Sequence, residues 1–516
     1  MNKIIKSLVL AALATGTVCA HSHTSHTTIA LRSHGYNLPM NYTTFNELIS
    51  RNAADKFGAN FQVTGFYQES NSGKKLGEYF GMYNHHNLWL GHIADGAVLA
   101  GADLDLAYLI HDNAATARSE ANIHFDPKSI SYGATFAYYQ GLDKLAKGLF
   151  LSINLPVVHV ENNMHMTVSI PSTNATSATT VAQVQNYFNG SLTHGVSATT
   201  DLQDALTRGK IDGHRSKTNL ANIGIKFGYN FLNKEDYHFG FNVAVDVPTG
   251  NENNADYLFS PVVGGKNWAL GAGLQGCYRV WGEEDHNIKL GMVADYRYLF
   301  ENTEYRTPGL INAAGVLRPW GQYHLLGSAV GSTAVTLLTP AANVITQKCK
   351  VTPGSQVEGL ANIAYNNGGF SFDLGYNLFW REKEAVTSKQ TLATSTYGVA
   401  NRGLLSTTGV ATTGKYSNAG TSTTTGAFGT HGKQFDEGYA LADEATPTYW
   451  ISQTNLDFSQ AATPSILTHK IYSGLGYSFK EWDTPLMMAV GGSYEFGSDN
   501  YAPDFWAVYG KLGVAF

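Results

Sequence analysis

The chain has 516 residues, of which 14% are charged and 12% aromatic, and its formal net charge is −6 at pH 7. Soluble domains carry roughly 25% charged residues, so this composition argues against a string of such domains. The mild acidity and the lack of a dense Lys/Arg cluster argue against a nucleic-acid-binding protein. After residue 20, no apolar run reaches the ~18 residues that a membrane-spanning helix needs.

The first twenty residues have the pattern of a secretory signal peptide. Lys3 and Lys6 precede a short apolar core at residues 8–14, and Val18-Cys19-Ala20 fits a cleavage site built of small residues. We therefore predict a signal peptide at residues 1–20.

The predicted mature chain begins with His21-Ser22-His23. A free amine with a histidine in third place can bind Cu(II) or Ni(II) in square-planar geometry. His21 and His23 are thus a weak candidate metal site, and a short histidine tract without function at a flexible end is the stronger alternative.

From residue 219 onward, the sequence alternates apolar and polar residues with a period of two. Ile223, Ile225 and Phe227 share one face of the first such segment, while Asn222, Gly224 and Lys226 share the other. This pattern is typical of a strand between an apolar and a polar medium. Strands are predicted at 219–231, 237–247, 268–280, 288–300, 357–365, 370–380, 471–479, 486–496 and 506–516, and earlier at 61–67, 104–110, 130–138 and 149–155.

The connections between these strands alternate in length. Short turns close one end of each hairpin, and long loops follow at the other end, at 158–216, 301–356 and 382–469. Outer-membrane barrels have this asymmetry. In the clearest strands, no apolar-face position is Asp, Glu, Lys or Arg, which fits either lipid exposure or a sandwich core. Aromatic residues at both strand ends favour two membrane interfaces.

The last strand places Trp506, Val508, Leu512, Val514 and Phe516 on one face. It resembles the final strand of Gram-negative outer-membrane β-barrels, whose assembly machinery reads a terminal aromatic residue. The resemblance implies that Val514 and Phe516 act as an assembly signal. It also implies the barrel-assembly machinery and outer-membrane lipid as partners, and the cell outer membrane as the location.

We therefore predict an all-β chain whose residues 59–516 form a transmembrane antiparallel up-and-down barrel with long extracellular loops. Bacterial barrels have even strand counts. A hairpin at 61–83 would give 14 strands, which we prefer, and 12 is the alternative. Residues 21–58 are predicted to be a periplasmic or plug segment with a short helix at 44–57. Weak helices are predicted at 181–188 and 200–211.

Strand parity assigns the polar faces to the lumen, where the selectivity of a barrel resides. We expect two layers of charge: Lys226, Arg279, Lys289 and Lys511 in the periplasmic half, opposed only by Asp373, and Asp246, Asp295, Glu358 and Glu495 in the outer half with Arg297, Arg381 and Lys470. Such a basic inner half would favour anionic or zwitterionic solutes. An equal alternative is that the charges pair across strands and set no selectivity. The predicted pore-lining residues are Lys226, His238, Asp246, Arg279, Lys289, Asp295, Arg297, Glu358, Asp373, Arg381, Lys470, Glu495 and Lys511.

The function predicted from these features is a porin-type channel for passive or weakly selective diffusion of small solutes. We expect no catalytic residue and no cofactor, since no HExxH or GxSxG motif is present, and a homo-oligomer is a further option. One alternative is a surface adhesin or structural barrel whose loops bind a partner, suggested by the Ser/Thr/Gly-rich stretch at 387–432.

Two further alternatives are a barrel hydrolase and a hydrophobic-substrate uptake barrel. Val247-Pro248-Thr249-Gly250 resembles the start of a loop in uptake barrels of the aromatic-degradation type, although Pro and Gly often simply end a strand. Cys277 and Cys349 could pair in an oxidising periplasm or remain thiols, and the sequence favours neither.

Overall fold

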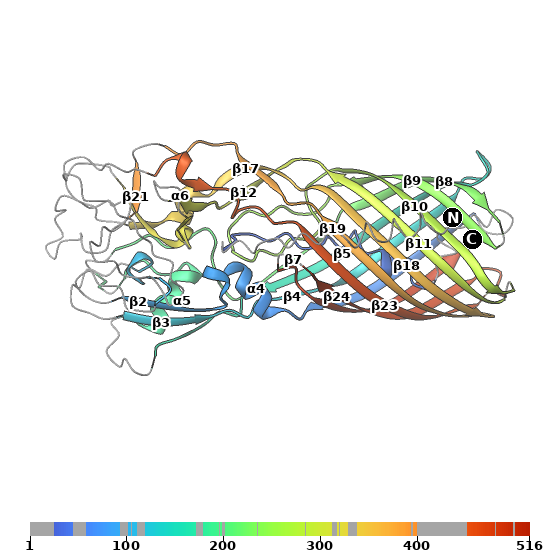
Figure 1. The fold of residues 1–516 in the computed structure, drawn as a ribbon, viewed down its shortest axis with the longest axis horizontal. Helices are drawn as coiled ribbons and strands as arrows, with labels where there is room; N and C mark the ends of the chain where they lie inside the picture. Colours follow the sequence, from blue (N-terminus) through green and yellow to red (C-terminus); the bar gives the residue numbers. More distant parts are fainter. Residues whose placement is uncertain are drawn as a thin grey trace, which may run out of the picture.

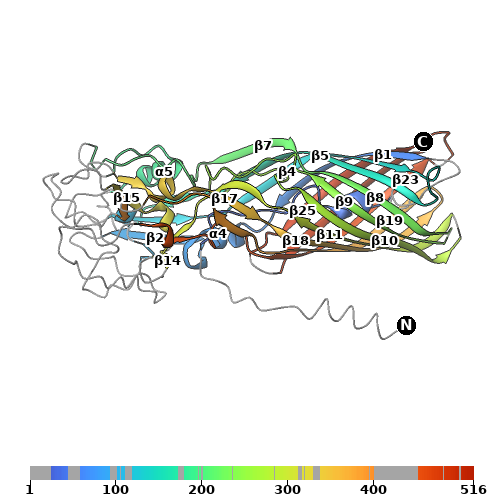
Figure 2. The ribbon, with the colours of Figure 1, turned by 90° about the horizontal axis from the view of Figure 1, so that it is seen from above.

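The molecule is elongated, with a β-barrel at one end and a cap of folded loops at the other (Figures 1 and 2). The computed structural model describes residues 25–44, 58–92, 102–104, 106–110, 119–171, 179–195, 197–198, 202–234, 236–283, 285–311, 317–318, 320–328, 338–393, 396–399, 451–479, 481–498 and 501–516. The predicted signal peptide, His21 and His23 lie outside these residues, as do residues 45–57 of the predicted helix at 44–57 and most of the stretch 387–432.

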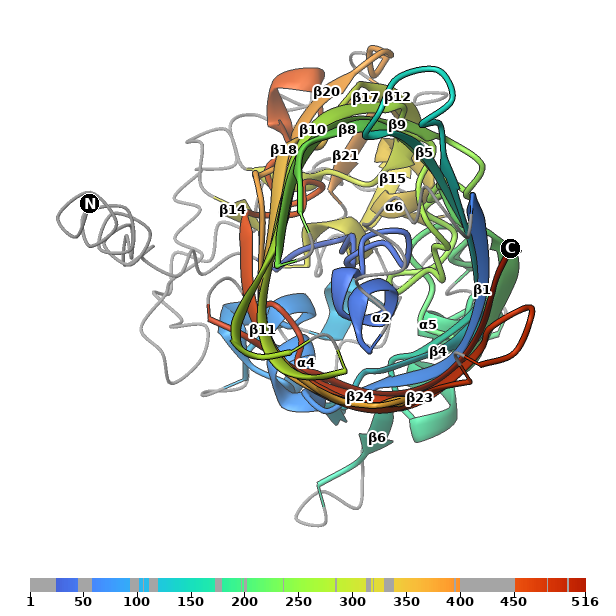
Figure 3. The same ribbon diagram turned by 90° about the vertical axis from the view of Figure 1, so that its right-hand side faces the viewer.

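Twelve antiparallel strands of the described chain form the barrel. The first of them, β1, pairs with β4 on one side and with the last strand, β25, on the other, so the sheet closes on itself (Figure 3). The strands are β1 (Ala59–Ser70), β4 (Lys128–Gly141), β5 (Leu149–Asn163), β8 (Ile223–Asn233), β9 (Tyr237–Val247), β10 (Ala269–Gly282), β11 (His286–Leu299), β18 (Gly354–Asn367), β19 (Phe370–Arg381), β23 (Ile466–Phe479), β24 (Leu486–Gly497) and β25 (Phe505–Ala515).

The antiparallel barrel is confirmed with the alternative count of 12 strands, and the preferred count of 14 is wrong. The strand predicted at 61–67 is present in β1, and every strand predicted from residue 130 onward is present. The strand predicted at 104–110 is wrong, because its leucines are buried in the cap, where Leu106–Tyr108 forms the 3-10 helix η3. The hairpin predicted at 61–83 is wrong as well, because α4 (Gly73–Phe80) follows β1.

Large apolar side chains cover the outer face of the barrel. Phe227, Leu270 and Ile363 are each about half exposed, and they share this face with many other aromatic and aliphatic residues. Monomeric proteins in water rarely expose apolar patches of more than a few hundred Å². The outer face therefore contacts lipid, and the closed antiparallel barrel is that of a protein of the cell outer membrane. Among the described residues, no helix is long and apolar enough to cross a membrane.

The end of the barrel opposite the cap has short turns and also holds both ends of the barrel-forming chain. The backbone of Ala59 at the start of β1 exchanges two hydrogen bonds with Phe516, at 2.8 and 2.9 Å. The first and last strands of the barrel thus satisfy each other's backbone N–H and C=O groups at this end. We refer to this end as the short-turn end and to the other as the cap end.

The cap consists of the described parts of residues 71–127, 164–213, 248–268, 300–353 and 382–465. Its short strands form four three-stranded sheets among the described residues. Besides α4 and η3, its elements are η1 (Met82–Asn84), β2 (Asn87–His92), β3 (Ser119–His124), β6 (Thr167–Ser169), α5 (Val181–Asn189), β12 (Asn302–Arg306), β13 (Gly309–Ile311), β14 (Leu317–Arg318), η4 (Gly321–Tyr323), β15 (Leu325–Ser328), β16 (Leu338–Pro340), α6 (Ala341–Ile345), β17 (Gln347–Thr352), β20 (Ala385–Ser388), β21 (Tyr397–Val399), η5 (Gln453–Asn455) and β22 (Leu456–Asp457).

The helix predicted at 181–188 is confirmed as α5. Thr180 caps it, and the side chain of Gln183 bonds back to the Thr180 backbone, so two otherwise unpaired N–H groups are satisfied. The helix predicted at 200–211 is wrong, since the described residues 202–211 include no helix.

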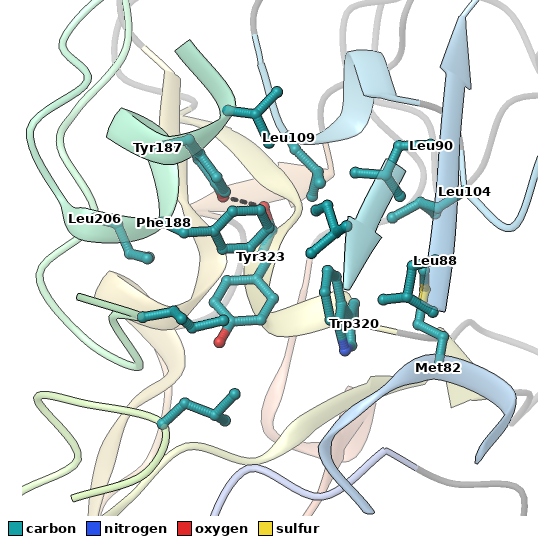
Figure 4. Close-up of a cluster of buried hydrophobic side chains, with 14 of the residues drawn as sticks. Met82, Leu88, Leu90, Leu104, Leu109, Tyr187, Phe188, Leu206, Trp320 and Tyr323 are labelled. Carbon is teal, nitrogen blue, oxygen red and sulfur yellow. Dashed lines mark hydrogen bonds between the residues drawn. The ribbon is translucent and has the colours of Figure 1, made fainter. Parts of the chain in front are cut away.

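The cap has a hydrophobic core of its own, to which several loops contribute (Figure 4). Trp320 is fully buried between Phe125 and Phe188, with ring centroids 5.7 and 5.6 Å away, and its indole N–H donates to the Phe80 carbonyl at 3.0 Å. The Tyr187 hydroxyl donates to the carbonyl of Tyr323. Loops that are far apart in sequence therefore form one packed unit.

The two cysteines of the described chain lie in different sheets, and no disulfide joins them. Cys277 belongs to β10 of the barrel and Cys349 to β17 of the cap, and both are buried. The sequence left open whether these cysteines form a disulfide or remain thiols, and in the structure both are thiols.

We expect Trp320→Ala to destabilise the cap by about 3–5 kcal/mol, because it removes a fully buried ring and leaves a cavity. Limited proteolysis should then cut the cap faster while the barrel stays resistant. Trp482→Ala is a matched control, because Trp482 is 56% exposed at the short-turn end. Equal protease resistance of the Trp320→Ala cap and the wild-type cap would contradict the prediction.

Candidate functional site

The interior of the barrel is the candidate site, because alternate strand residues direct polar side chains into it. The structure places all thirteen predicted pore-lining residues on this inner face. Eleven of them are buried, and Lys226 and Arg279 are slightly more exposed. Which of them a solute meets stays a prediction.

Residues 25–44, which we call the luminal segment, run through the barrel. They begin among cap residues and end near the short-turn end, and Figure 3 shows helix α2 (Leu38–Tyr42) inside the ring of strands. Pro39 lies in the first turn of this helix, where a backbone N–H has no acceptor within the helix, so proline costs no hydrogen bond. The segment fills much of the space that an open pore would need.

The first contact between the luminal segment and the wall centres on Arg32. Its guanidinium bonds to Glu358 of β18 and, at 3.0 Å, to Glu495 of β24. Lys470 of β23 also contacts Glu495, at 2.9 Å, and the backbone N–H of Leu38 donates to Glu358 at 3.0 Å. Removing one partner of such a buried pair leaves an uncompensated charge and costs about 3–5 kcal/mol.

A second group of charges surrounds Tyr36. Its hydroxyl donates to Asp246 at 3.0 Å, and Arg297 bonds to the same carboxylate at 2.8 Å. Asp295 accepts from Arg297 at 3.3 Å and from Lys226 at 2.7 Å. The sequence places Lys226 and Asp295 in different halves of the lumen, but in the structure their side chains are in contact. These charges pair across strands, which was one of the two alternatives given by the sequence.

The luminal segment is also held near the short-turn end. Lys511 donates to the carbonyls of Asn41 and Thr43 at 3.0 and 2.9 Å. The Thr43 hydroxyl lies 2.9 Å from the Tyr509 hydroxyl, and the backbone N–H of Thr44 donates to Asp373. The segment is thus bonded to the wall in its middle and at its C-terminal end.

At the cap end, the luminal segment is held by what we call the clamp, formed by residues 26–30 and the cap residues that they contact. The imidazole of His26 stacks on Tyr79 of α4 at 4.3 Å, and the Tyr79 hydroxyl donates to the Thr28 carbonyl at 2.7 Å. The backbone N–H of Thr27 donates to Gln460, and that of Ala30 to the Thr463 hydroxyl, at 3.0 and 2.9 Å. The clamp therefore connects the luminal segment to two cap loops.

Two cavities of about 70 Å³ each adjoin the luminal segment. Apolar side chains of both the segment and the wall line much of the first, and the second is more polar. Both include Ile29, Leu31, Tyr36 and Val262. Among the other residues, the first is lined by His34, Gln68, Ser129, Ser131, Val160, Ile466 and Phe505, and the second by Asn222, Asn253, Asn267, Arg306, Gln356, Arg381 and Glu384.

The wall has a seam where β5 changes its partner. The first part of β5 pairs with β8, and the part after Pro156 pairs with β7 (His214–Leu220). The other edge of β7 has no strand partner in the described chain, and β9 ends at Val247. Pro156 has no N–H to donate to the ladder, which fits a break in pairing at this point.

Loop residues cover this seam. The Thr249 hydroxyl of Val247-Pro248-Thr249-Gly250 bonds to the Ala221 carbonyl. Gly264 has φ +67°, and a Cβ there would lie 2.9 Å from the Ala221 Cα, so glycine is required. Val262 and Gly264 also border the first cavity, so this loop contacts both the cavity and the seam.

Sequence reasoning missed Arg32, Tyr36 and the seam. The luminal segment has no strand period, and nothing in the sequence indicates that Arg32 meets Glu358, 326 positions away. Val514 and Phe516 lie at the short-turn end, and their role in assembly stays a prediction. In the described residues, no group of three or more His, Cys, Asp or Glu side chains is arranged to hold a metal ion.

No family model matches the sequence, and no curated protein matches it. Among solved structures, an outer membrane channel of Pseudomonas putida F1 is 11% identical, with 89% of this chain and 96% of that chain covered and a TM-score of 0.37. The Pseudomonas putida toluene transporter TodX is 9% identical, with 95% and 99% covered and a TM-score of 0.28. The NanC porin is 7% identical, with 88% and 98% covered and a TM-score of 0.26. Similarities this distant carry no argument about the solute.

We expect Arg32→Gln to lower the free energy of unfolding by about 3–5 kcal/mol, since Glu358 loses its ion-pair partner. Urea unfolding of the barrel in vesicles measures this. Arg208→Gln removes a half-exposed cap pair with Asp256 and should cost less than about 1 kcal/mol. If both variants unfold at the same urea concentration, the Arg32 contact does not hold the segment.

Acid should loosen the clamp. Burial lowers the pKa of His26 from 6.5 to about 4, and nearby Lys383 adds to the lowering. Because the folded state keeps His26 neutral, the clamp has its full stability above pH 6.5 and loses it as the pH falls toward 4. At pH 5 the loss is about 2 kcal/mol.

Amide hydrogen exchange of residues 25–30 at pH 7 and pH 5, corrected for intrinsic rates, measures this loss. His26→Phe keeps a stacking ring without a titrating group, so its protection should be the same at both pH values. A wild-type clamp with equal protection at pH 7 and pH 5 would show the prediction to be wrong.

Proposed function

We propose that the chain is an outer-membrane uptake channel for small apolar solutes, and that the luminal segment is its closed gate. The observation that carries this proposal is the luminal segment itself, which runs through the barrel and is bonded to the wall by Arg32, Tyr36 and Thr44.

The size of the cavities supports a closed state. Each has about 70 Å³, and a cavity of about 150 Å³ is known to hold benzene in another protein. A solute of that size fits only after the luminal segment has moved. The contacts of Arg32 and Tyr36 are discrete ion pairs and hydrogen bonds, so the segment has a defined bound position that it can leave.

The surroundings of the first cavity support an apolar solute. Leu31, Val160, Ile466 and Phe505 line it, and so does Val262 of the loop that covers the seam. The charges of the interior are engaged with one another, as in the pairs of Arg297 and Lys226 with Asp295, and so offer little to a permeating ion. We therefore prefer apolar uptake to the open polar pore predicted from the sequence.

A second candidate is a surface protein whose cap binds a partner. The hydrophobic core around Trp320 favours it, because loops that served only to border a pore would not need a packed core. In that case the luminal segment would be a permanent structural element, and conductance would not respond to its release.

Planar-bilayer recordings test the gate. We expect the wild-type barrel to carry brief, rare openings and Arg32→Gln to raise the open fraction at least tenfold, because the segment loses its central contact. Arg208→Gln should behave as the wild type. A large, steady wild-type conductance would contradict the gate and return the protein to the porin-type prediction.

Solute class is tested in cells with an intact outer membrane, because apolar solutes cross plain lipid vesicles unaided. Cells that produce the chain should accumulate a small uncharged aromatic probe several-fold faster than cells without it. Accumulation of a sugar of similar size should not change. Faster sugar entry with unchanged entry of the aromatic probe would contradict the apolar assignment.

A further inference from the structure

Arg381 differs from the other buried arginines beside the luminal segment. Arg32, Arg297 and Arg306 each contact two carboxylates. Arg381 contacts no carboxylate in the described structure, and its one hydrogen bond there runs from Nη2 to the Ala30 carbonyl at 2.7 Å. Its Nε is buried and has no hydrogen-bond partner among the described residues.

This arrangement leaves several N–H groups of one cation unsatisfied. A guanidinium has five N–H donors, and its burial is unfavourable unless acceptors meet them. Arg381 is only 5% exposed, so bulk water does not supply these acceptors. Glu384 is the nearby carboxylate, but it is engaged by Arg306 at 3.1 Å and by the Thr463 N–H at 2.8 Å.

Arg381 also borders an empty space. Arg381 lines the second cavity of about 70 Å³, together with Ser33, Asn222 and Gln356. One water needs about 10–15 Å³ of such volume, so the cavity holds a ligand of a few heavy atoms. It lies against the luminal segment near the clamp.

We propose that this cavity binds a small monocarboxylate, whose oxygens accept hydrogen bonds from Arg381. The planar guanidinium matches a carboxylate, because two parallel N–H groups can meet its two oxygens. The charges of Arg306 and Arg381 balance those of Glu304 and Glu384. A monoanion adds one negative charge to this balanced group, whereas a dianion such as phosphate adds nearly two.

The proposal goes beyond the proposed function, since the carboxylate is a separate ligand that binds beside the luminal segment in the closed state. The binding event itself requires no transport. It can therefore be measured on the purified full-length chain in detergent, apart from conductance.

Isothermal titration calorimetry with sodium formate, acetate and butyrate tests the site. We expect acetate to bind the wild type, and Arg381→Gln to weaken that binding at least tenfold. Arg208→Gln removes a cap pair with Asp256, and neither residue lines the cavity, so this variant should bind acetate as the wild type does.

Thermal unfolding separates binding from folding. Arg381→Gln removes an incompletely bonded cation, so without acetate it should unfold at or above the wild-type temperature. Acetate should raise the unfolding temperature of the wild type and leave that of Arg381→Gln unchanged, because a ligand stabilises only the state that binds it. Arg306→Gln leaves Glu304 and Glu384 without their cation and should unfold earlier.

The proposal is overturned if none of the three acids binds the wild type, if Arg381→Gln binds acetate equally well, or if inorganic phosphate binds more tightly than acetate. Its fate differs from that of the gate. Steady wild-type conductance combined with Arg381-dependent acetate binding would refute the gate and support the site. Rare openings without acetate binding would do the reverse.

Discussion

The ion pairs between Arg32 and two wall carboxylates, Glu358 and Glu495, tie the N-terminal segment to the barrel. Glu358 projects from β18 into the interior, where it is buried, and it has no other cation within ion-pair distance in the described chain. A barrel without the luminal segment would have to hydrate this carboxylate, and the space would then be a wet pore. With the segment in place, Arg32 neutralises the wall, Leu38 donates its N–H to the same carboxylate, and α2 occupies the axis. The polar interior and the N-terminal segment are therefore two parts of one buried network.

The barrel and the cap arrange their apolar residues in opposite ways, because the barrel is surrounded by lipid and the cap by water. In the barrel, apolar side chains such as Leu270 face outward because the surroundings are lipid, and the polar residues turn inward. In the cap, the order is the usual one for water, and Trp320 and Tyr323 are fully buried in a core. The clamp lies at the junction, where His26 and Thr27 bond to cap loops and the residues that follow enter the barrel. A movement of the cap is thus mechanically connected to the lumen.

The sequence predicts the barrel well because lipid imposes a simple rule on every second residue. β9 (Tyr237–Val247) has the predicted bounds, and the inner positions of Asp295 and Glu358 follow from parity alone. The rule does not extend to the cap. Leu104, Leu106 and Ile110 alternate as a strand would, but their environment is a globular core reached through loops, so the predicted strand is wrong. It also does not reach the luminal segment, whose irregular backbone is held by single contacts over long sequence separations, such as that of Tyr36 with Asp246. Arg381 was predicted to face the lumen, but its lack of a counterion depends on where Glu384 points.

The pairing of β1 with β25 has a consequence for biogenesis. These two strands are far apart in the sequence, so the barrel cannot close until β25 has been synthesised and inserted. The luminal segment precedes β1 and runs from the cap end toward the opposite end, where β1 begins. Threading a chain with charged and hydrogen-bonded groups through a sealed cylinder would strip each group of water in turn. If the luminal segment binds to the inner face of the sheet before the barrel closes, that step is avoided. Pairing of β25 with β1 then encloses a segment that is already in place. The strand pairing therefore constrains the order in which the protein folds, as well as the stability of the folded state.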